Sequence, residues 1–235
     1  MPLQGSLPPD NPASTLQEFF IKSRSVSFLS TDFSQVETAA FAPFLEEYLQ
    51  DYQEVESLEE AFLFMSRWQI LATHVEGKMG VEFFNELLLR RAIALGKQAL
   101  YLPIIWTKND YVKHLYNGMA GIWIRYKNSP EKDQIVFPGE EAPQHLLGKI
   151  SPKKAPYSLG FCLSVHKSQG SEFDRVLLSL GEGSEVFGKK LLYSAATRAK
   201  KKLHILGLKS TFTKTLAEDH WRDSQIGKRL LDFQG

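Results

Sequence analysis

The sequence predicts an α/β protein with a mostly parallel sheet, helices on both faces and a small β insert. Two observations support this fold class. Strand-like and helix-like segments alternate along residues 21–102 and 157–235, which is the pattern of a parallel sheet with crossover helices. Residues 103–156 instead hold short strand-like runs separated by turn residues, which is typical of a β insert.

The individual elements follow from local patterns. Four prolines within residues 1–14 predict a loose tail or linker over 1–20. Helical spacing and a Ser57-Leu-Glu-Glu capping box predict five helices. The first starts near Thr31, with a kink or break at Pro43, and the second starts near Ser57. The other three cover about 81–96, 187–197 and 211–231. Apolar runs between turns predict strands at 25–30, 69–74, 158–165, 175–180 and 202–206, with insert strands near 99–106, 119–126 and 134–137.

Composition excludes several classes of protein. The chain has 235 residues and one cysteine, Cys162, so an intramolecular disulfide framework and a multi-cysteine zinc site are excluded. No apolar run reaches about 18 residues, so we expect no transmembrane helix and no membrane partner. The N-terminus lacks the basic and apolar regions of a secretory signal, and we therefore expect a cytoplasmic protein.

The charges are distributed unevenly along the chain. Residues 1–100 carry 7 Lys and Arg against 14 Asp and Glu, whereas residues 151–235 carry 15 against 8. A basic C-terminal third favours a polyanionic partner such as nucleic acid or nucleotide phosphate. The alternative is that these lysines only solvate a surface.

A polar run, Ser164 to Asp174 (SVHKSQGSEFD), follows a predicted strand. Ligands of open parallel sheets bind at the carboxyl ends of strands. His166, Lys167 and Ser168 are suited to phosphate contacts, and Gly170 allows close approach of the backbone. The alternative is a polar loop with one hydrogen-bonded histidine.

Arg198 follows the predicted helix at 187–197, whose residues Ser194, Ala195 and Ala196 are small enough to pack closely on a sheet. An arginine at this position can reach a phosphate held by another domain. Alternatively, it balances the dipole at the helix carboxyl end.

Together, SVHKSQGSEFDRVLL and LLYSAATRAKKKLHILG resemble helicase motifs V and VI of superfamily 1. Their sequences are similar to those of the RecD family, the alpha subunits of bacterial exodeoxyribonuclease V. QILATHVEGKMGVEFFNELL resembles the opening of that family's second motor domain. IIWTKNDYVKHLYNGMAGIWI resembles the start of its SH3-like insert. The resemblance covers about residues 65–208 in the family's order.

The resemblance implies a RecA-like second motor domain with an SH3-like β-barrel insert, in a 5′-to-3′ DNA helicase of a recombination-repair helicase–nuclease. ATP would lie between this domain and an N-terminal motor domain that holds the P-loop and Mg²⁺, so no metal ligands are expected here. Single-stranded DNA, the N-terminal motor domain and nuclease or helicase subunits of the RecBCD type are the implied partners.

The resemblance also implies residue roles. Arg198 would be the arginine finger on the γ-phosphate, Gln169 and Gly170 would lie beside that phosphate, and Glu172 would face the ribose. Contacts with single-stranded DNA would come from His166, Lys167, Ser168, Thr107, Lys108 and Asn109. Nearby Trp106 and Tyr111 either stack on bases or fill the core of the insert.

The chain departs from the family pattern at three places. Val75-Glu76-Gly77 lacks the basic residue common before this glycine. Asn117-Gly118 is followed by Met119 where relatives often have Asp, and the motif VI threonine pair is Ser194 and Thr197.

A complete motor would also need a P-loop, GxxxxGK[ST]. None of the Gly-Lys pairs precedes Ser or Thr, and the Asp-Glu dipeptide of a Walker B motif is absent; the pairs start at Gly77, Gly96, Gly148, Gly188 and Gly227. We therefore expect the second half of a RecD-type helicase, inactive by itself. Two alternatives remain: a DNA-binding or assembly module without motor activity, and a related superfamily 1 helicase that works alone or on RNA.

Overall fold

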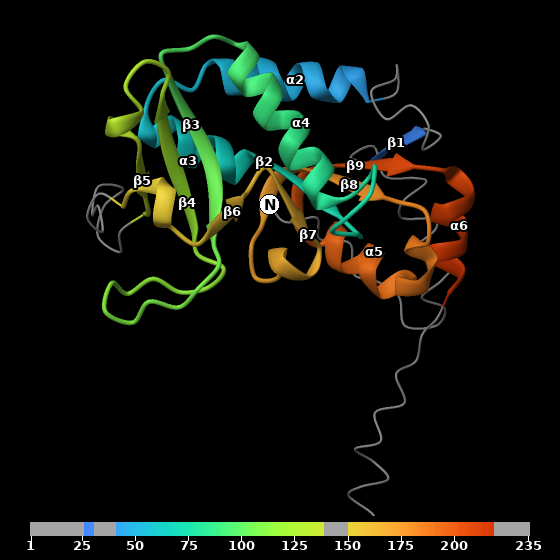
Figure 1. Cartoon of the computed structure of the whole chain (residues 1–235). Coiled ribbons are helices and arrows are strands. Elements are labelled where there is room, and N and C mark those ends of the chain that lie inside the picture. The colour runs from blue at the N-terminus through green and yellow to red at the C-terminus, as the bar shows by residue number, and fades with distance from the viewer. Residues whose placement is uncertain (1–25, 31–40, 139–149, 219–235) are drawn as a thin grey trace, which may run out of the picture.

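The computed structural model describes residues 26–30, 41–138 and 150–218, and the structural statements below concern these residues. A five-stranded sheet forms the centre of the molecule (Figure 1). Every neighbouring pair in it is parallel, and the spatial order is β1 (Val26–Ser30), β9 (Ala199–Gly207), β8 (Phe173–Leu180), β2 (Trp68–Ala72) and β7 (Cys162–Ser164). The predicted tail at 1–20 lies outside the described residues.

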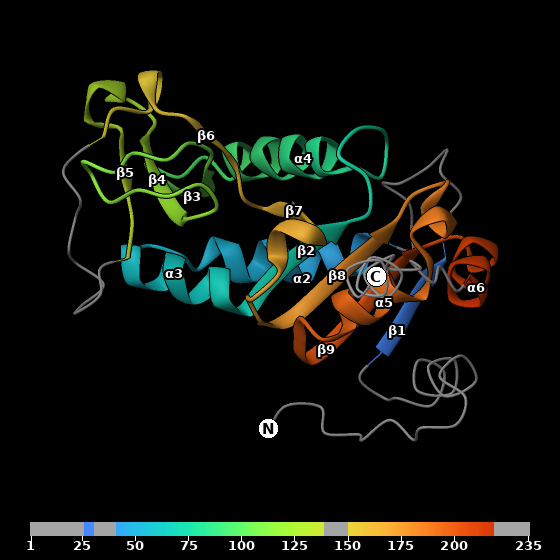
Figure 2. The same ribbon diagram turned by 90° about the horizontal axis from the view of Figure 1, so that it is seen from below.

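Helices cover both faces of this sheet (Figure 2). Side chains of a strand alternate between the two faces, so Ile70 and Leu71 of β2 enter different cores. The core with Ile70 includes α2 (Ala42–Gln53), α3 (Leu58–Arg67) and α4 (Val81–Ala94), whereas the core with Leu71 includes α5 (Gly188–Ala196) and α6 (Lys209–Ala217). The predicted fold class, a parallel α/β sheet with two helical layers, is confirmed.

Two predicted helix starts can be compared directly with the structure. The Ser57 hydroxyl accepts a hydrogen bond from the Glu60 N–H at 3.2 Å, and the Glu60 carboxylate accepts the Ser57 N–H at 2.9 Å, so the capping box is confirmed. Helix α2 begins beside Pro43, which needs no N–H partner in the first turn. The expected start near Thr31 lies outside the described residues. The last helix, expected over about 211–231, instead ends at Ala217, where Glu218 has an extended backbone; residues 219–231 are not described.

A second, antiparallel sheet is inserted between α4 and β7. Its order is β5 (Gln134–Val136), β4 (Ala120–Tyr126), β3 (Ala99–Trp106) and β6 (Tyr157–Leu159). We expected the insert to cover residues 103–156. Strand β3 begins four residues before this range, and β6 begins directly after it. Whether these strands close into an SH3-like barrel, and the domain boundaries themselves, stay predictions.

The small sheet contributes to two cores. Leu102 and Ile122 pack in the large core with helices α2, α3 and α4, whereas Ile104 and Phe137 belong to a separate cluster within the insert. The base of the insert is therefore continuous with the main core, and its far end has a core of its own.

The segment 158–165 corrects one prediction. We expected one strand, but the chain leaves the small sheet after β6 and enters the parallel sheet as β7. Gly160 lies at the crossing, where its N–H donates to the Pro103 carbonyl at 2.8 Å and a Cβ would come within 3.2 Å of the Ile104 backbone nitrogen. The buried Gln69 amide donates to the carbonyls of Gly160 and Phe161 at 3.3 and 3.1 Å, so the crossing is held from β2.

Within the described residues, no helix has both the length and the apolar character needed to cross a membrane.

Candidate functional site

Residues 165–172 join the carboxyl end of β7 to the amino end of β8. Both strands run parallel to β2, so the two ends of this loop lie at opposite edges of the sheet. A turn of 3₁₀ helix, His166–Ser168, forms the first part, and Gly170, with a φ of +87°, lies in the second. Only the first part therefore lies at the carboxyl edge, where we expected the whole polar run.

The carboxyl-edge part exposes two of its three predicted DNA contacts. His166 and Lys167 are exposed, and no described acid pairs with either side chain. Ser168 does not fit its predicted role, because its side chain is fully buried and its hydroxyl donates to the Val165 carbonyl at 2.8 Å. This hydroxyl closes the turn and cannot reach a phosphate.

The amino-edge part lies against Arg198. The Arg198 guanidinium donates from Nη1 to the Ser171 carbonyl at 2.9 Å, and the Phe173 N–H donates to the Arg198 carbonyl at 2.8 Å. The two segments that resemble motifs V and VI are therefore joined through both a side chain and the backbone, across 27 positions of sequence.

Two further residues orient the same guanidinium. Its Nε donates to the Ser194 carbonyl at 3.3 Å, and its Nη2 to the Thr197 hydroxyl at 3.2 Å. The contact with Ser194, in the last turn of α5, is the one that the helix-dipole interpretation expects. Each guanidinium nitrogen makes one bond, so Nη1 and Nη2 each retain an N–H that no described residue accepts.

Gln169, Gly170 and Glu172 are exposed on this side of the sheet. A Cβ at Gly170 would meet no atom within 4 Å, so the backbone there is open to a ligand. The Glu172 carboxylate lies 3.9 Å from the Lys200 ammonium, a loose and exposed pair. The structure thus gathers Gln169, Gly170, Glu172 and Arg198 near the start of β8 and β9.

The insert presents its predicted contacts on the loop between β3 and β4. Thr107, Lys108 and Asn109 are exposed, and the Asn109 side-chain oxygen accepts the Asn117 N–H at 2.8 Å. This loop and the 3₁₀ turn at 166–168 lie on the same, lower side of the molecule in Figure 1.

The two nearby aromatic residues have different environments. Trp106 is 2% exposed and packs edge-on against Phe137 at a centroid distance of 5.7 Å. Trp106 therefore fills the core of the insert, and the alternative that it stacks on bases is wrong. Tyr111 is 72% exposed and remains accessible for stacking.

Met119, where the family resemblance leads us to expect an acid, contributes to a turn. Its sulfur accepts the Tyr116 N–H at 3.1 Å, and Gly118 between them has a φ of +94°. A thioether therefore closes the turn before β4. Val75, Glu76 and Gly77, the other unusual loop, are exposed at the carboxyl end of β2.

Sequence reasoning missed two polar groups near the loop. Asn85, on the buried face of α4, holds the backbone of Cys162; a lone amide among apolar residues of an amphipathic helix was the available signal. His74 and Thr73 form a hydrogen-bonded cluster with Ser184, which has no sequence signature.

Burial raises the pKa of the Cys162 thiol well above its usual value, so the single cysteine is a poor nucleophile.

Among the described side chains, no three His, Cys, Asp or Glu residues are close enough to hold a metal ion. The location of Mg²⁺ on another domain stays a prediction.

The loop at residues 165–172 and Arg198 lie in the part of the chain that matches a known protein family. The family described as UvrD-like helicase C-terminal domain matches residues 159–206, from β6 to the end of β9. RecBCD enzyme subunit RecD of Haemophilus influenzae is 31% identical over 167 residues, which are 66% of this chain and 24% of that protein. The corresponding subunit of Mycolicibacterium smegmatis is 28% identical over 181 residues, covering 73% of this chain and 30% of that protein.

The chain carries a RecD-like helicase C-terminal region. It also resembles the ATP-dependent RecD2 DNA helicase of Deinococcus radiodurans, with 26% identity over 153 residues, or 61% of this chain and 20% of that protein. The RecD-like chain thus spans less than a third of the length of these curated relatives.

Solved structures of Pif1 helicases are also similar. Pif1 from Candida albicans has a TM-score of 0.44 at 15% identity, covering 82% of the RecD-like chain and 58% of that chain. Bacteroides Pif1 bound to ssDNA has a TM-score of 0.38 at 15% identity, covering 82% and 53%.

Proposed function

We propose that the RecD-like chain is the second motor domain of an ATP-dependent 5′-to-3′ DNA helicase. It would act with an N-terminal motor domain that binds ATP phosphates and Mg²⁺. The larger assembly would be a helicase–nuclease of the exodeoxyribonuclease V type, working in recombinational repair with nuclease or helicase partner subunits.

The observation that carries this proposal is the bond between the Arg198 guanidinium and the Ser171 carbonyl at 2.9 Å. It orients a guanidinium with two unused N–H groups beside the open backbone of Gly170. Such a pre-oriented arginine is suited to stabilise charge on a phosphate presented by a facing domain. Arg198 is therefore the proposed arginine finger, with Gln169 and Gly170 at the γ-phosphate and Glu172 at the ribose.

DNA contacts are proposed at the other end of the same loop. His166 and Lys167 lie exposed at the carboxyl edge, and Lys108 with Thr107 and Asn109 extends this side onto the insert. Residues 151–218 carry 12 Lys and Arg against 5 Asp and Glu, which favours a phosphate backbone as partner. We leave Ser168 out of this surface because its hydroxyl is buried.

The placement of the loop supports a route for coupling. One end of residues 165–172 lies beside Arg198 and the other carries the proposed DNA contacts, so closure on ATP would move both ends together. This is a physical link between nucleotide state and grip on DNA.

The test measures ATP turnover in a protein in which this chain is combined with a P-loop motor domain. Arg198→Ala should lower kcat by about 10³ with little change in KM, because an arginine finger acts in the transition state. Arg198→Lys should rescue little, since a point charge cannot reproduce the planar fork. Lys202→Ala, at an exposed basic residue of β9 four positions away, is the matched control and should stay within about twofold of the wild-type kcat, as expected for a rim charge. Near-normal turnover in Arg198→Ala would return Arg198 to a helix-dipole role.

The DNA-binding module without motor activity makes the opposite prediction. In that case ATP turnover of the combined protein is independent of Arg198, whereas binding of single-stranded DNA persists.

A further inference from the structure

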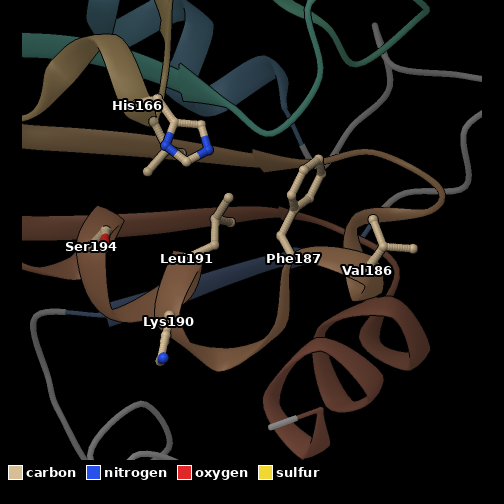
Figure 3. A pocket seen from close by; sticks show the side chains of 7 residues that line it. His166, Val186, Phe187, Lys190, Leu191 and Ser194 are labelled. Atoms are coloured by element: carbon tan, nitrogen blue, oxygen red, sulfur yellow. The ribbon is translucent and has the colours of Figure 1, made fainter. Parts of the chain in front are cut away.

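A pocket of about 470 Å³ opens between the 3₁₀ turn at 166–168 and helix α5, in the size range of small-ligand sites. Figure 3 shows the rings of His166 and Phe187 on two sides of it, with Leu191 between them. Val186, at the rim, is 63% exposed. The walls are thus mainly apolar and aromatic, with an imidazole on one side; the remaining lining residues are Val165, Lys190 and Ser194.

The Phe187 side of the pocket is pre-organised. The His74 ring contacts the Phe187 ring edge-on at a centroid distance of 5.5 Å. His74 Nδ1 is hydrogen-bonded to the Thr73 hydroxyl at 2.9 Å, and Thr73 to the Ser184 hydroxyl at 2.7 Å. Since Ser184 in turn donates to the Gly181 carbonyl, the chain of bonds holds His74 in place behind Phe187. A fixed aromatic wall reduces the entropy lost when a flat ligand stacks on it.

The charges around the pocket favour a ligand that carries phosphate. Lys190 belongs to the lining, and Lys167 directly follows the lining residue His166 in the chain; both are exposed, and no described acid pairs with either ammonium. The exposed Lys190 side chain extends away from the His166 ring (Figure 3). A flat apolar group inside and a phosphate outside are the two parts of a nucleotide.

We propose that this pocket holds one nucleobase of the bound DNA strand, stacked against Phe187 beside the His166 ring. The inference rests on the proposed function, because the strand must run past residues 166–168. A base held in this way gives the domain a grip on the strand that does not depend on phosphate charge. Stacking tolerates any base, since each has a flat face.

The test uses fluorescence anisotropy of the full chain with labelled oligo(dT) and with the same oligonucleotide in which every base is replaced by an abasic tetrahydrofuran. Wild-type protein should bind oligo(dT) at least about fivefold more tightly than the abasic strand. Phe187→Leu keeps an apolar side chain but removes the ring, so it should abolish this preference and leave abasic binding unchanged. Tyr193→Leu is the matched control, because Tyr193 is an exposed aromatic on α5 outside the pocket, and it should keep the preference.

Three results would overturn the pocket proposal: a wild-type protein without the preference, a Phe187→Leu variant that keeps it, or equal weakening of both strands by Phe187→Leu. Binding of free adenosine monophosphate that Phe187→Leu abolishes, in a wild-type protein that shows no preference for oligo(dT) over the abasic strand, would assign the pocket to a free nucleotide and overturn the DNA base as occupant. Lys167→Ala separates this proposal from the proposed function, because it should weaken both strands equally. If Lys167→Ala weakens both strands equally but the wild-type protein shows no preference for oligo(dT), only the pocket proposal is wrong. If the wild-type protein binds neither strand, both the pocket proposal and the proposed DNA contacts are wrong.

Discussion

The side-chain amide of Asn85 pairs with the backbone of Cys162 as a neighbouring strand would. Its Nδ2 donates to the Cys162 carbonyl at 3.1 Å, and the Cys162 N–H donates to its Oδ1 at 2.9 Å. Among the described strands, β7 lies at the edge of the parallel sheet, so helix α4 supplies partners that no further described strand provides. The strand that leads into the loop at 165–172 is thereby held from both sides, by β2 and by α4.

Asn85→Leu should therefore destabilise the chain. The apolar side chain would leave the buried N–H and carbonyl of Cys162 without partners, which we expect to lower the free energy of unfolding by about 2–4 kcal/mol. Urea unfolding followed by circular dichroism measures this. Asn128→Ala, at an exposed amide, is the control and should change stability by less than about 0.5 kcal/mol. A loss below about 1 kcal/mol in Asn85→Leu would show that water or a backbone shift replaces the two bonds.

His204 predicts a pH dependence of stability. Its Nδ1 is hydrogen-bonded to the Ser27 hydroxyl at 2.6 Å, and its Nε2 is buried without a partner among the described residues. Desolvation lowers the pKa of His204 below its usual 6.5, more than Glu47 raises it. The unfolded chain therefore binds the proton more readily, so the neutral histidine's contribution is fully present above about pH 6.5 and is lost as pH falls through the folded pKa.

Urea unfolding between pH 7.5 and 5 should thus show that the free energy of unfolding decreases as the pH is lowered. This one group can account for at most about 1.4 kcal/mol per pH unit. His204→Gln should flatten the fall, and the exposed His114→Asn should leave it unchanged. Identical pH profiles for wild type and His204→Gln would rule out His204 as the source.

Lys167 predicts the salt dependence of DNA binding. Each phosphate contact with single-stranded DNA releases counterions, so Lys167→Ala should weaken binding of all sequences alike and flatten the slope of log affinity against log salt by roughly 0.7. The control is Lys127→Ala, because exposed Lys127 lies at the end of the small sheet away from the loop at 107–119. Unchanged affinity and slope in Lys167→Ala would remove residues 166–168 from the DNA surface.

The isolated chain should hydrolyse ATP no faster than a buffer control. The physical reason is that no residue pattern in it can cradle the β- and γ-phosphates. Phosphate release measured with and without single-stranded DNA tests this. Turnover that Arg198→Ala abolishes would show that this chain holds a complete nucleotide site.

The local features of this protein could be predicted from its residues alone. Alternating periodicity predicted the α/β class, and the Ser57 capping box located the start of α3. The polar run after β7 and the position of Arg198 were also evident, because such features depend on residues close together in the chain.

Which of these residues are accessible, and which contact one another, depends on how the chain folds in three dimensions. The break at Gly160 depends on the backbone of β3, more than 50 residues away, and the burial of Ser168 and Trp106 depends on packing around them. The pairing of Arg198 with Ser171, and the pocket between His166 and Phe187, likewise join separate motifs. Periodicity and residue type specify a segment's conformation, whereas burial and contact arise from partners that the fold brings together.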